Sequence, residues 1–361
     1  MVTPRPAIAR LPYYHPGERK ARAERTYKLS SNESALGPGP GTLAAYRETA
    51  EQIHRYPDPA WIALREALAA RHDLNAEQIV CGAGSEDLIG TLAHTYLDPG
   101  SSAVHSVFGF PLYRIVTIAC DATPVPAPEK AMRADVDALL AAVCDDTRLL
   151  FLANPNNPTG TVLPFDRIRT LHEALPPHVL LVLDSAYADY LEDEPTYDSG
   201  LALVREGADN VVVTRTFSKL HGLAGLRIGW AYAAPAIVEA LRRTGRTFGV
   251  NAAAQAAATA AVGDTEHLAA AVAHNAKWRA WLERELASLG YGLTSSAANF
   301  VLVHMPGDQA PAAFEFLKDR GVIVRPAAPY GLPASLRVTV GLEDENRAFI
   351  EAMKAFAVIS Q

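Results

Sequence analysis

The stretch Leu149–Gly160 reads LLFLANPNNPTG and decides the fold class. Its first five residues are all apolar, which is typical of a strand in a parallel sheet that helices cover on both faces. A second apolar run follows at Val179–Leu183. Polar residues come directly after both runs, and in open α/β sheets this carboxyl edge is where ligands bind. The stretch therefore predicts both a sheet and the place of a site on it.

Short β-branched runs alternate with longer helical patterns on both sides of this stretch, from about residue 60 to about residue 250. The runs are Ile79–Cys81, Ala103–His105 and Asn210–Thr214. Such alternation predicts an α/β fold with a mostly parallel sheet between two helical layers. Ligand-binding residues are then expected on the loops that follow the strands.

The pattern changes after about residue 262, where a long amphipathic segment, His267–Leu289, begins. Strand-like Asn299–His304, helix-like Ala310–Arg320 and strand-like Leu336–Val340 follow it, which predicts a smaller α+β domain. We expect three parts: an N-terminal arm over residues 1–35 that packs on the small domain or on a partner, a large domain over 36–262, and a small domain over 263–361.

Composition excludes several classes of protein. The chain has 361 residues, 49% hydrophobic and 20% charged, which is a globular balance rather than that of a disordered, collagen-like or coiled-coil chain. The formal net charge is −7 and there is no basic block, so nucleic-acid binding is not expected. An anionic ligand would therefore have to be bound by a few residues at one site rather than by a basic surface.

Cysteine usage and hydropathy favour a cytoplasmic protein. Cys81, Cys120 and Cys144 have no CxxC spacing, so neither a disulfide framework nor a metal site is expected. The first ten residues show no secretory signal. The least polar stretch, Ala252–Val262, falls short of the roughly 20 apolar residues of a membrane span. We expect it to be a small-residue helix packed closely on a neighbour.

Two loops are candidate anion and amide sites. Gly82–Ser85 lies between a strand and a helix, where amides and a hydroxyl can hold a phosphate, although an ordinary serine N-cap explains it as well. Asn154–Gly160 offers three amide side chains on a loop stiffened by two prolines. Its alternative interpretation is a plain turn.

Two further segments carry ionisable groups. Asp184, with Tyr187 nearby, ends a buried strand, and a buried carboxylate needs donors or a cation; the alternative is a helix N-cap. Lys219 stands after a strand between hydroxyl residues, with Arg227 beyond a glycine-rich turn, but could equally be a surface lysine. Together the four segments supply a Schiff-base lysine, a carboxylate for a ring nitrogen, donors for a ring oxygen and a phosphate cup, which are the parts that hold pyridoxal phosphate.

The chain resembles the histidinol-phosphate aminotransferases, a family of fold type I pyridoxal-phosphate enzymes. The resemblance runs from Lys28–Glu33 through the four segments to Leu336–Gly341, and the NPNNPTG and SK…GLAGLRIG runs are specific in combination. It implies that Lys219 forms the Schiff base, that Asp184 pairs with the ring nitrogen, and that Tyr187 and Asn157 bind the ring oxygen. Phe110 would stack on the ring. The residues that the resemblance assigns to the cofactor phosphate are Ala83, Gly84, Ser85, Thr216, Ser218, Arg227 and, from the partner subunit of a homodimer, Tyr56.

The implied reaction is ping-pong transamination between L-histidinol phosphate and 2-oxoglutarate, in histidine biosynthesis. Arg337 would bind the anionic end of the substrate, with Arg325 as a second cation and Tyr14 facing the substrate; a surface position at a strand edge is the alternative for each arginine. An aromatic aminotransferase and a threonine-phosphate decarboxylase are rival functions on the same fold. A non-catalytic homologue would have lost Lys219 or Asp184.

The sequence departs from the family pattern at three places. Ser34 and Ala35 stand where relatives have Asn-Pro, so we expect a differently shaped entrance to the site. Ser185 replaces a glutamate that in the family does not touch the cofactor, so we expect little loss. The segment Pro12–Gly17 has one extra residue, which leaves open whether Tyr13 or Tyr14 faces the substrate.

Overall fold

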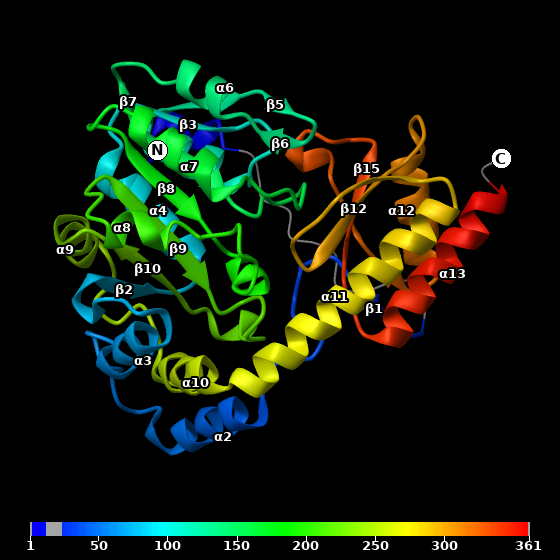
Figure 1. Cartoon of the computed structure of the whole chain (residues 1–361), viewed down its shortest axis with the longest axis horizontal. Helices are drawn as coiled ribbons and strands as arrows, with labels where there is room; N and C mark the ends of the chain where they lie inside the picture. The colour runs from blue at the N-terminus through cyan, green and yellow to red at the C-terminus, as the bar shows by residue number, and fades with distance from the viewer. Residues whose placement is uncertain (1, 12–23, 360–361) are drawn as a thin grey trace.

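The computed structural model describes residues 2–11 and 24–359, in a large and a small unit joined by one long helix (Figure 1). A seven-stranded sheet with the order β2-β10-β9-β8-β7-β3-β4 forms the centre of the large unit. Its strands are β2 (Ile79–Gly82), β3 (Ser102–Ser106), β4 (Thr123–Ala127), β7 (Thr147–Ala153), β8 (Leu180–Asp184), β9 (Val211–Thr216) and β10 (Gly229–Ala233). All neighbours pair in parallel except β10, which is antiparallel to both β2 and β9. The predicted fold class is thereby confirmed.

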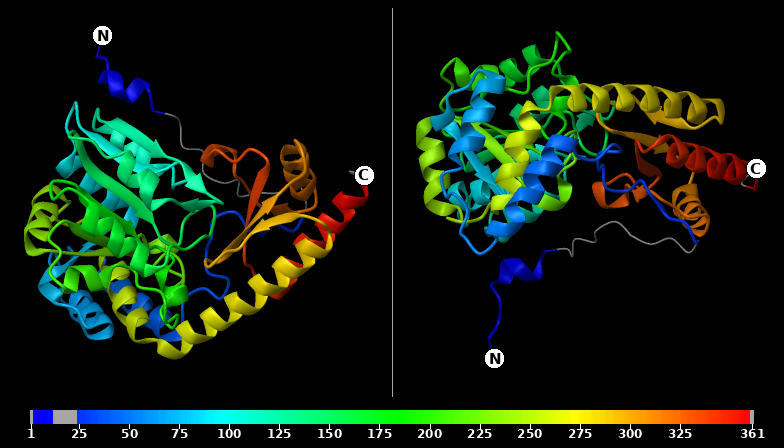
Figure 2. Two further views of the ribbon diagram at one scale, coloured as in Figure 1. Left: turned by 45° about the horizontal axis from the view of Figure 1, so that its top comes forward. Right: turned by 90° about the horizontal axis from the view of Figure 1, so that it is seen from below.

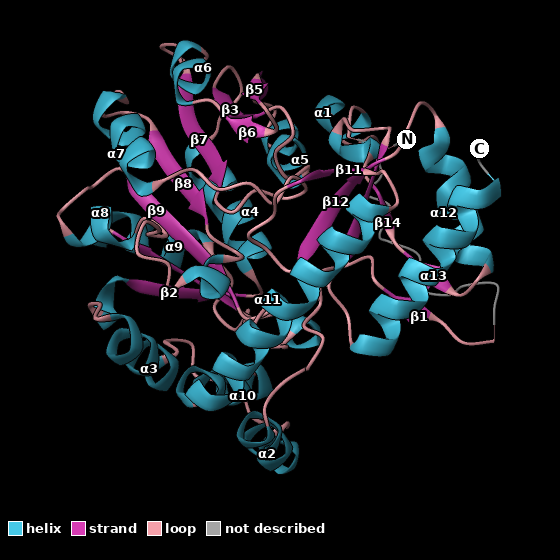
Figure 3. Cartoon of the chain, turned by 45° about the vertical axis from the view of Figure 1, so that its right-hand side comes forward, coloured by secondary structure: helices cyan, strands magenta, loops and turns pink. Residues whose placement is uncertain are grey.

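Helices cover both faces of this sheet (Figure 3). Helix α4 (Ser85–Tyr96) packs against α5 (Leu112–Ala119) and α9 (Pro235–Thr244) on one face, and α6 (Val136–Ala141), α7 (Phe165–Ala174) and α8 (Leu201–Arg205) lie on the other. The middle strands β7 and β8 are therefore buried almost throughout, as their apolar sequences predict.

Three more helices lie at the β2 end of the sheet, namely α2 (Pro40–Glu48), α3 (Ile62–His72) and α10 (Ala252–Gly263). The small residues of α10 let it pack against both α2 and α3, as the sequence predicts. No helix in the described part of the chain has the length and apolar character needed to cross a membrane.

The small unit is built on a four-stranded antiparallel sheet, ordered β11-β12-β15-β14. The strands are β11 (Gly292–Thr294), β12 (Phe300–His304), β14 (Arg325–Pro326) and β15 (Ser335–Thr339), and the helices are α11 (Thr265–Ser288), α12 (Gln309–Asp319) and α13 (Glu343–Ile359). The shorter elements of the chain are β5 (Glu129–Lys130), β6 (Arg133–Ala134) and the 3-10 turns η1 (Thr49–Gln52), η2 (Ala76–Gln78), η3 (Ala188–Leu191), η4 (Ala224–Leu226) and η5 (Ala328–Tyr330).

Helix α11 belongs to both units (Figure 2). Its first turns pack Leu268 and Ala271 against Leu220 of the large unit, whereas Trp278 and Leu282 lie in the core of the small unit. The expected boundary at residue 262 falls at the end of α10, so part of the expected small domain contacts the large one. The division into 36–262 and 263–361 stays a prediction.

The N-terminal arm contacts both units. Strand β1 (Tyr27–Lys28) pairs in parallel with β13 (Val322–Ile323) of the small unit. The short helix α1 (Pro6–Ala9) lies against α5, and Arg5 Nη2 donates to the carbonyl of Ala119 at 2.6 Å. Tyr13 and Tyr14 lie outside the described residues.

Candidate active site

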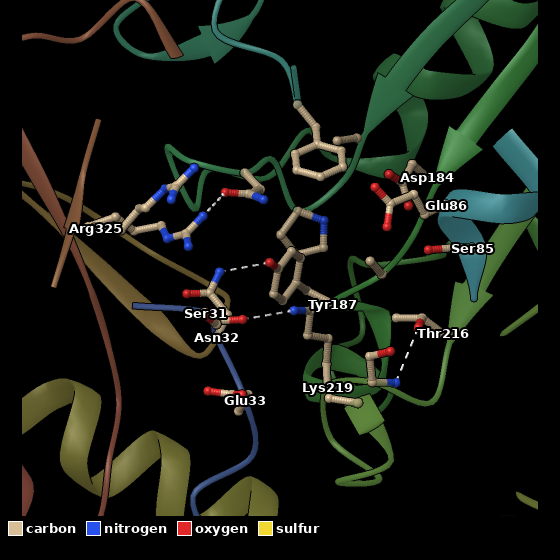
Figure 4. Close-up of a pocket in the computed structure, with 18 of the residues that line it drawn as sticks. Ser31, Asn32, Glu33, Ser85, Glu86, Asp184, Tyr187, Thr216, Lys219 and Arg325 are labelled. Carbon is tan, nitrogen blue, oxygen red and sulfur yellow. Dashed lines mark hydrogen bonds between the residues drawn. The ribbon is translucent and has the colours of Figure 1, made fainter. Parts of the chain in front are cut away.

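A pocket of about 280 Å³ opens at the carboxyl edge of the large sheet, where the small unit and the N-terminal arm face it (Figure 4). It gathers most residues that the sequence singles out, namely Ser85, Phe110, Asn157, Asp184, Tyr187, Thr216, Ser218, Lys219, Arg227, Arg325 and Arg337. Residues far apart in the chain therefore meet at one place because their strands end at one edge.

One end of the pocket is a cup for an anion at the start of α4. Gly84 precedes the helix with φ +94°, and a Cβ there would lie 2.7 Å from Arg227 Nη2. A Cβ on Gly229 would lie 2.5 Å from the amide nitrogen of Ser85. The two glycines thus allow Arg227 and β10 to approach the positive end of α4, where the first amides of a helix have no intrahelical acceptor.

Hydroxyl groups complete this cup. Arg227 Nη1 donates to Ser218 Oγ at 3.3 Å, and the amide of Ser218 donates to Thr216 Oγ1 at 3.1 Å. Glu86 also lies here, with its carboxylate 3.6 Å from Arg227 Nη2, an ion pair that the sequence does not predict. The cup combines a guanidinium, hydroxyls and a helix N-terminus, which is a chemistry suited to phosphate.

The amides of Ala83 and Gly84 are already engaged within the chain. Ala83 N–H donates to Asp87 Oδ2 at 2.9 Å, and Gly84 N–H to the carbonyl of Gly82 at 2.7 Å. The amides left for an anion are those of the first turn of α4, beginning with Ser85. A direct phosphate contact by Ala83 stays a prediction.

Asp184 is the last residue of β8 and is buried beneath the pocket. Tyr113 Oη donates to Asp184 Oδ2 at 2.7 Å, and Thr214 Oγ1 donates to Oδ1 at 3.4 Å. Burial raises the pKa of the Asp184 carboxyl, and these donors oppose that rise. The next helical segment, η3, starts only at Ala188, so the N-cap alternative does not hold. Because its hydrogen-bond partners are neutral, the carboxylate suits a cationic nitrogen.

Lys219 follows β9 and points into the pocket, where Nζ donates to the carbonyl of Ser31 at 3.2 Å (Figure 4). Burial lowers its pKa to about 8, and Arg337 adds to this effect. A side chain so placed is not a solvated surface lysine. Its amine is then neutral in about a tenth of molecules at pH 7, far more than for an ordinary lysine, and a nucleophile or base must be neutral.

Tyr187 and Asn157 stand between the two units. Tyr187 Oη accepts a hydrogen bond from Asn32 Nδ2 at 2.8 Å, and burial raises its pKa to about 12, so it remains a phenol. Asn157 Oδ1 accepts from Arg337 Nη1 at 2.6 Å. Both side chains are held by residues of other segments before any ligand enters.

Two buried arginines face the pocket from adjacent strands of the small unit. Arg325 of β14 pairs in register with Arg337 of β15, and their exposed fractions are 7% and 4%. Arg337 also donates to Tyr330 Oη at 3.1 Å and to the carbonyl of Ser30 at 2.8 Å. Among the described residues, no acceptor pairs with its buried Nε. The surface alternative fails for both arginines, which together suit an anionic ligand group.

A buried ion cluster fixes the segments that carry Tyr187 and Lys219. Arg215 of β9 donates to Asp189 and, at 2.7 Å, to Glu192. It therefore ties the strand that leads to Lys219 to the turn that follows Tyr187. The sequence gives no sign of this link, because an arginine in a strand is usually a surface residue.

The sequence does not predict several residues of the site as functional, among them Ser30, Asn32, Tyr113 and Tyr330. Ser30 and Asn32 have a local signal, since both lie in the run that resembles the family, and Asn32 also has a positive φ of +55°. Tyr56 lies apart from the pocket of its own chain, with an exposed fraction of 82% and its ring stacked on Phe248 at 4.5 Å between centroids.

The sequence of this chain matches a known protein family. The model of the family "Aminotransferase class I and II" matches residues 25–353. The chain is therefore a class I and II aminotransferase, the enzyme class that the fold and the lysine-centred site define.

Curated relatives narrow this class. The histidinol-phosphate aminotransferase of Maricaulis maris is 48% identical over 98% of this chain and 99% of its own, and that of Rhodopseudomonas palustris strain BisB18 is 46% identical over 98% of each. The structure of the Sinorhizobium meliloti histidinol-phosphate aminotransferase in complex with pyridoxal-5'-phosphate is similar, with a TM-score of 0.90, 31% identity, and coverage of 99% of this chain and 98% of that one. The chain belongs to the histidinol-phosphate aminotransferase family, which confirms the resemblance.

Proposed function

We propose that the protein uses pyridoxal phosphate to transfer the amino group of L-histidinol phosphate to 2-oxoglutarate, giving imidazole acetol phosphate and glutamate in histidine biosynthesis. The observation that carries this proposal is the pair of buried guanidiniums, Arg325 and Arg337, in the same pocket as Lys219. One pair of cations can bind the phosphate of one substrate and a carboxylate of the other. The names of the relatives support the same substrate.

The residues present fit the cofactor. The cup of Ser85, Ser218 and Arg227 suits its phosphate, and among the described residues no cation hydrogen-bonds to the buried Asp184, which leaves the carboxylate for a pyridinium nitrogen. Tyr187 and Asn157 line the pocket and would bind the ring oxygen, and Phe110, also in the lining, would face the ring. Pyridoxal phosphate supplies an electron-poor ring that makes the α-hydrogen of the bound substrate acidic.

The protein's own groups then have distinct tasks. Lys219 Nζ, as a neutral amine, takes the α-proton of the substrate and holds it for return. Asp184 keeps a positive charge at the ring nitrogen by remaining an anion. Arg337 orients the substrate through its anionic group, in a site where Asn157 and Tyr330 already hold the guanidinium.

The test is a single-turnover absorbance scan of the cofactor-loaded protein without any keto acid. Histidinol phosphate, phenylalanine and threonine phosphate are added separately. The proposal expects the cofactor's visible band to be lost fastest with histidinol phosphate. Faster loss with phenylalanine would instead assign aromatic transamination, and carbon dioxide release from threonine phosphate would assign decarboxylation.

The active unit that we propose is a homodimer in the cytoplasm. The exposed aromatic pair of Tyr56 and Phe248, with exposed Ile53 nearby in sequence, supports a partner surface there. Tyr56 would then reach the cofactor phosphate of the other subunit. The three cysteines are unpaired, in keeping with a reducing compartment.

A further inference from the structure

Tyr113 makes the shortest contact to the carboxylate of Asp184. It lies in α5, with an exposed fraction of 1%, and its Oη donates to Asp184 Oδ2 at 2.7 Å. The other carboxylate oxygen, Oδ1, accepts the longer bond from Thr214, at 3.4 Å, and the backbone of Ala186 also hydrogen-bonds to the carboxylate. Tyr113 therefore holds one oxygen at short distance, and the carboxylate still lines the pocket in which a ligand would sit.

The ring of Tyr113 is fixed from two sides. It stacks on Phe151 of β7, with ring centroids 4.9 Å apart and planes at 2°, and Phe110 meets it edge-on at 6.1 Å and 81°. Aromatic pairs in these arrangements stabilise a ring orientation beyond the area that they bury. The phenol cannot swing away from Asp184 without breaking both contacts, and Phe110 is itself the residue expected to face the cofactor ring.

The hydrogen bond has one direction. Burial and the neighbouring carboxylate raise the pKa of Tyr113 well above its ordinary value, so the phenol keeps its proton and donates. For Asp184 the same bond opposes the effect of burial, which favours the neutral acid. Removing a donor to a buried anion is costly, because no water takes its place.

We propose that Tyr113 is a positioning residue, which holds Asp184 as an anion in the orientation that lets the carboxylate pair with the ring nitrogen of the cofactor. This inference rests on the proposed function, since it needs pyridoxal phosphate in the pocket. Tyr113 does not line the pocket itself and would act through Asp184.

The experiment compares the wild type with Tyr113→Phe, which removes the hydroxyl and keeps the ring. Dissociation constants of the apoprotein are measured for pyridoxal phosphate and for an analogue whose ring nitrogen is replaced by carbon. Loss of a hydrogen bond to a buried charge predicts roughly 10- to 100-fold weaker binding of pyridoxal phosphate. Binding of the analogue should hardly change, because it offers Asp184 nothing to pair with.

Tyr232→Phe is the matched control, since Tyr232 is equally buried in β10 but its hydroxyl faces Gln78, away from the pocket. It should leave both constants unchanged. An equal loss for both ligands in Tyr113→Phe, or no loss for either, would overturn the inference. Failure of the wild type to bind pyridoxal phosphate would instead overturn the proposed function.

A second comparison separates action through Asp184 from any other effect of Tyr113→Phe. Asp184→Asn has no carboxylate, so the double variant Asp184→Asn/Tyr113→Phe should bind the two ligands with the same ratio as Asp184→Asn alone. Equal ratios support action through Asp184. A further shift of the ratio in the double variant contradicts it.

Discussion

Arg227 fills the space that a side chain on Gly84 would need, since a Cβ there would lie 2.7 Å from Arg227 Nη2. Gly84→Ala should displace this guanidinium from the cup and strain a backbone at φ +94°. If Arg227 binds the cofactor phosphate as proposed, this change removes a charge-assisted bond, so we expect roughly 10- to 100-fold weaker binding of pyridoxal phosphate, measured by titration of the apoprotein.

Gly90→Ala in the same helix is the control, because a Cβ there meets no atom within 4 Å. It should leave the affinity for the cofactor unchanged and stabilise the fold by about 0.5–1 kcal/mol. Equal affinities of Gly84→Ala and Gly90→Ala would show that Arg227 does not act in the cup.

Lys219 should make the stability of the apoprotein depend on pH. Its pKa is about 8 when folded and 10.5 as a free side chain, so below pH 8 the folded state must charge an amine that resists charging. Between these two values the unfolded chain binds more protons, and the penalty disappears as the pH rises. Lys219→Met should therefore be more stable than the wild type at pH 7, by up to about 3 kcal/mol, with a gap that closes towards pH 10.

Denaturant unfolding of both proteins at several pH values measures this gap. Lys219→Arg, which stays charged throughout, should keep a constant deficit relative to Lys219→Met. If the gap between the wild type and Lys219→Met did not change with pH, Lys219 would have an ordinary pKa.

Arg325 should discriminate substrates by their phosphate. Arg325→Gln removes one of the two guanidiniums of the pocket, so kcat/KM for histidinol phosphate should fall roughly 10- to 100-fold. The kcat/KM for unphosphorylated histidinol should change little, because histidinol has no phosphate for Arg325 to bind. Arg320→Gln, an exposed arginine of the same unit that stacks on Phe316, is the control and should have no effect on either substrate. Equal losses for both substrates would assign Arg325 a role other than phosphate binding.

Tyr56 provides a test of the homodimer. Mixing Tyr56→Ala with Lys219→Ala and allowing subunits to exchange should restore activity, since a mixed dimer holds one site with both native residues. Each variant alone should have little or no aminotransferase activity. If Tyr56 served its own chain, every site of the mixture would be defective and no activity would return. Light scattering checks the mass of each sample.

Much of the large unit could be predicted from the sequence because its strands are apolar throughout. The segments 147–153 and 180–184 lie within a few residues of the expected runs. Two strands could not be predicted: β4 reads TPVPA and carries prolines that only an edge strand accepts, and β10 is an antiparallel strand in an otherwise parallel pattern.

Some residues of the candidate site could be predicted from the sequence, and others could not. Lys219, Asp184 and Asn157 follow predicted strands, so the common edge of the sheet brings them together. Tyr113 and Tyr330 could not be found, because their contacts with Asp184 and Arg337 depend on how helix and sheet, or two strands, pack. Nor could the sequence show that Asp87 engages the amide of Ala83.

The helix α11 is continuous over 24 residues and packs in both units, so neither unit has a complete core without it. Its first turns cover Leu220, the neighbour of Lys219, and its later turns complete the core of the small unit. A chain cut after residue 262 would leave Leu220 open to water beside the reactive lysine. A fragment that contains only one of the two units should therefore not be an active enzyme.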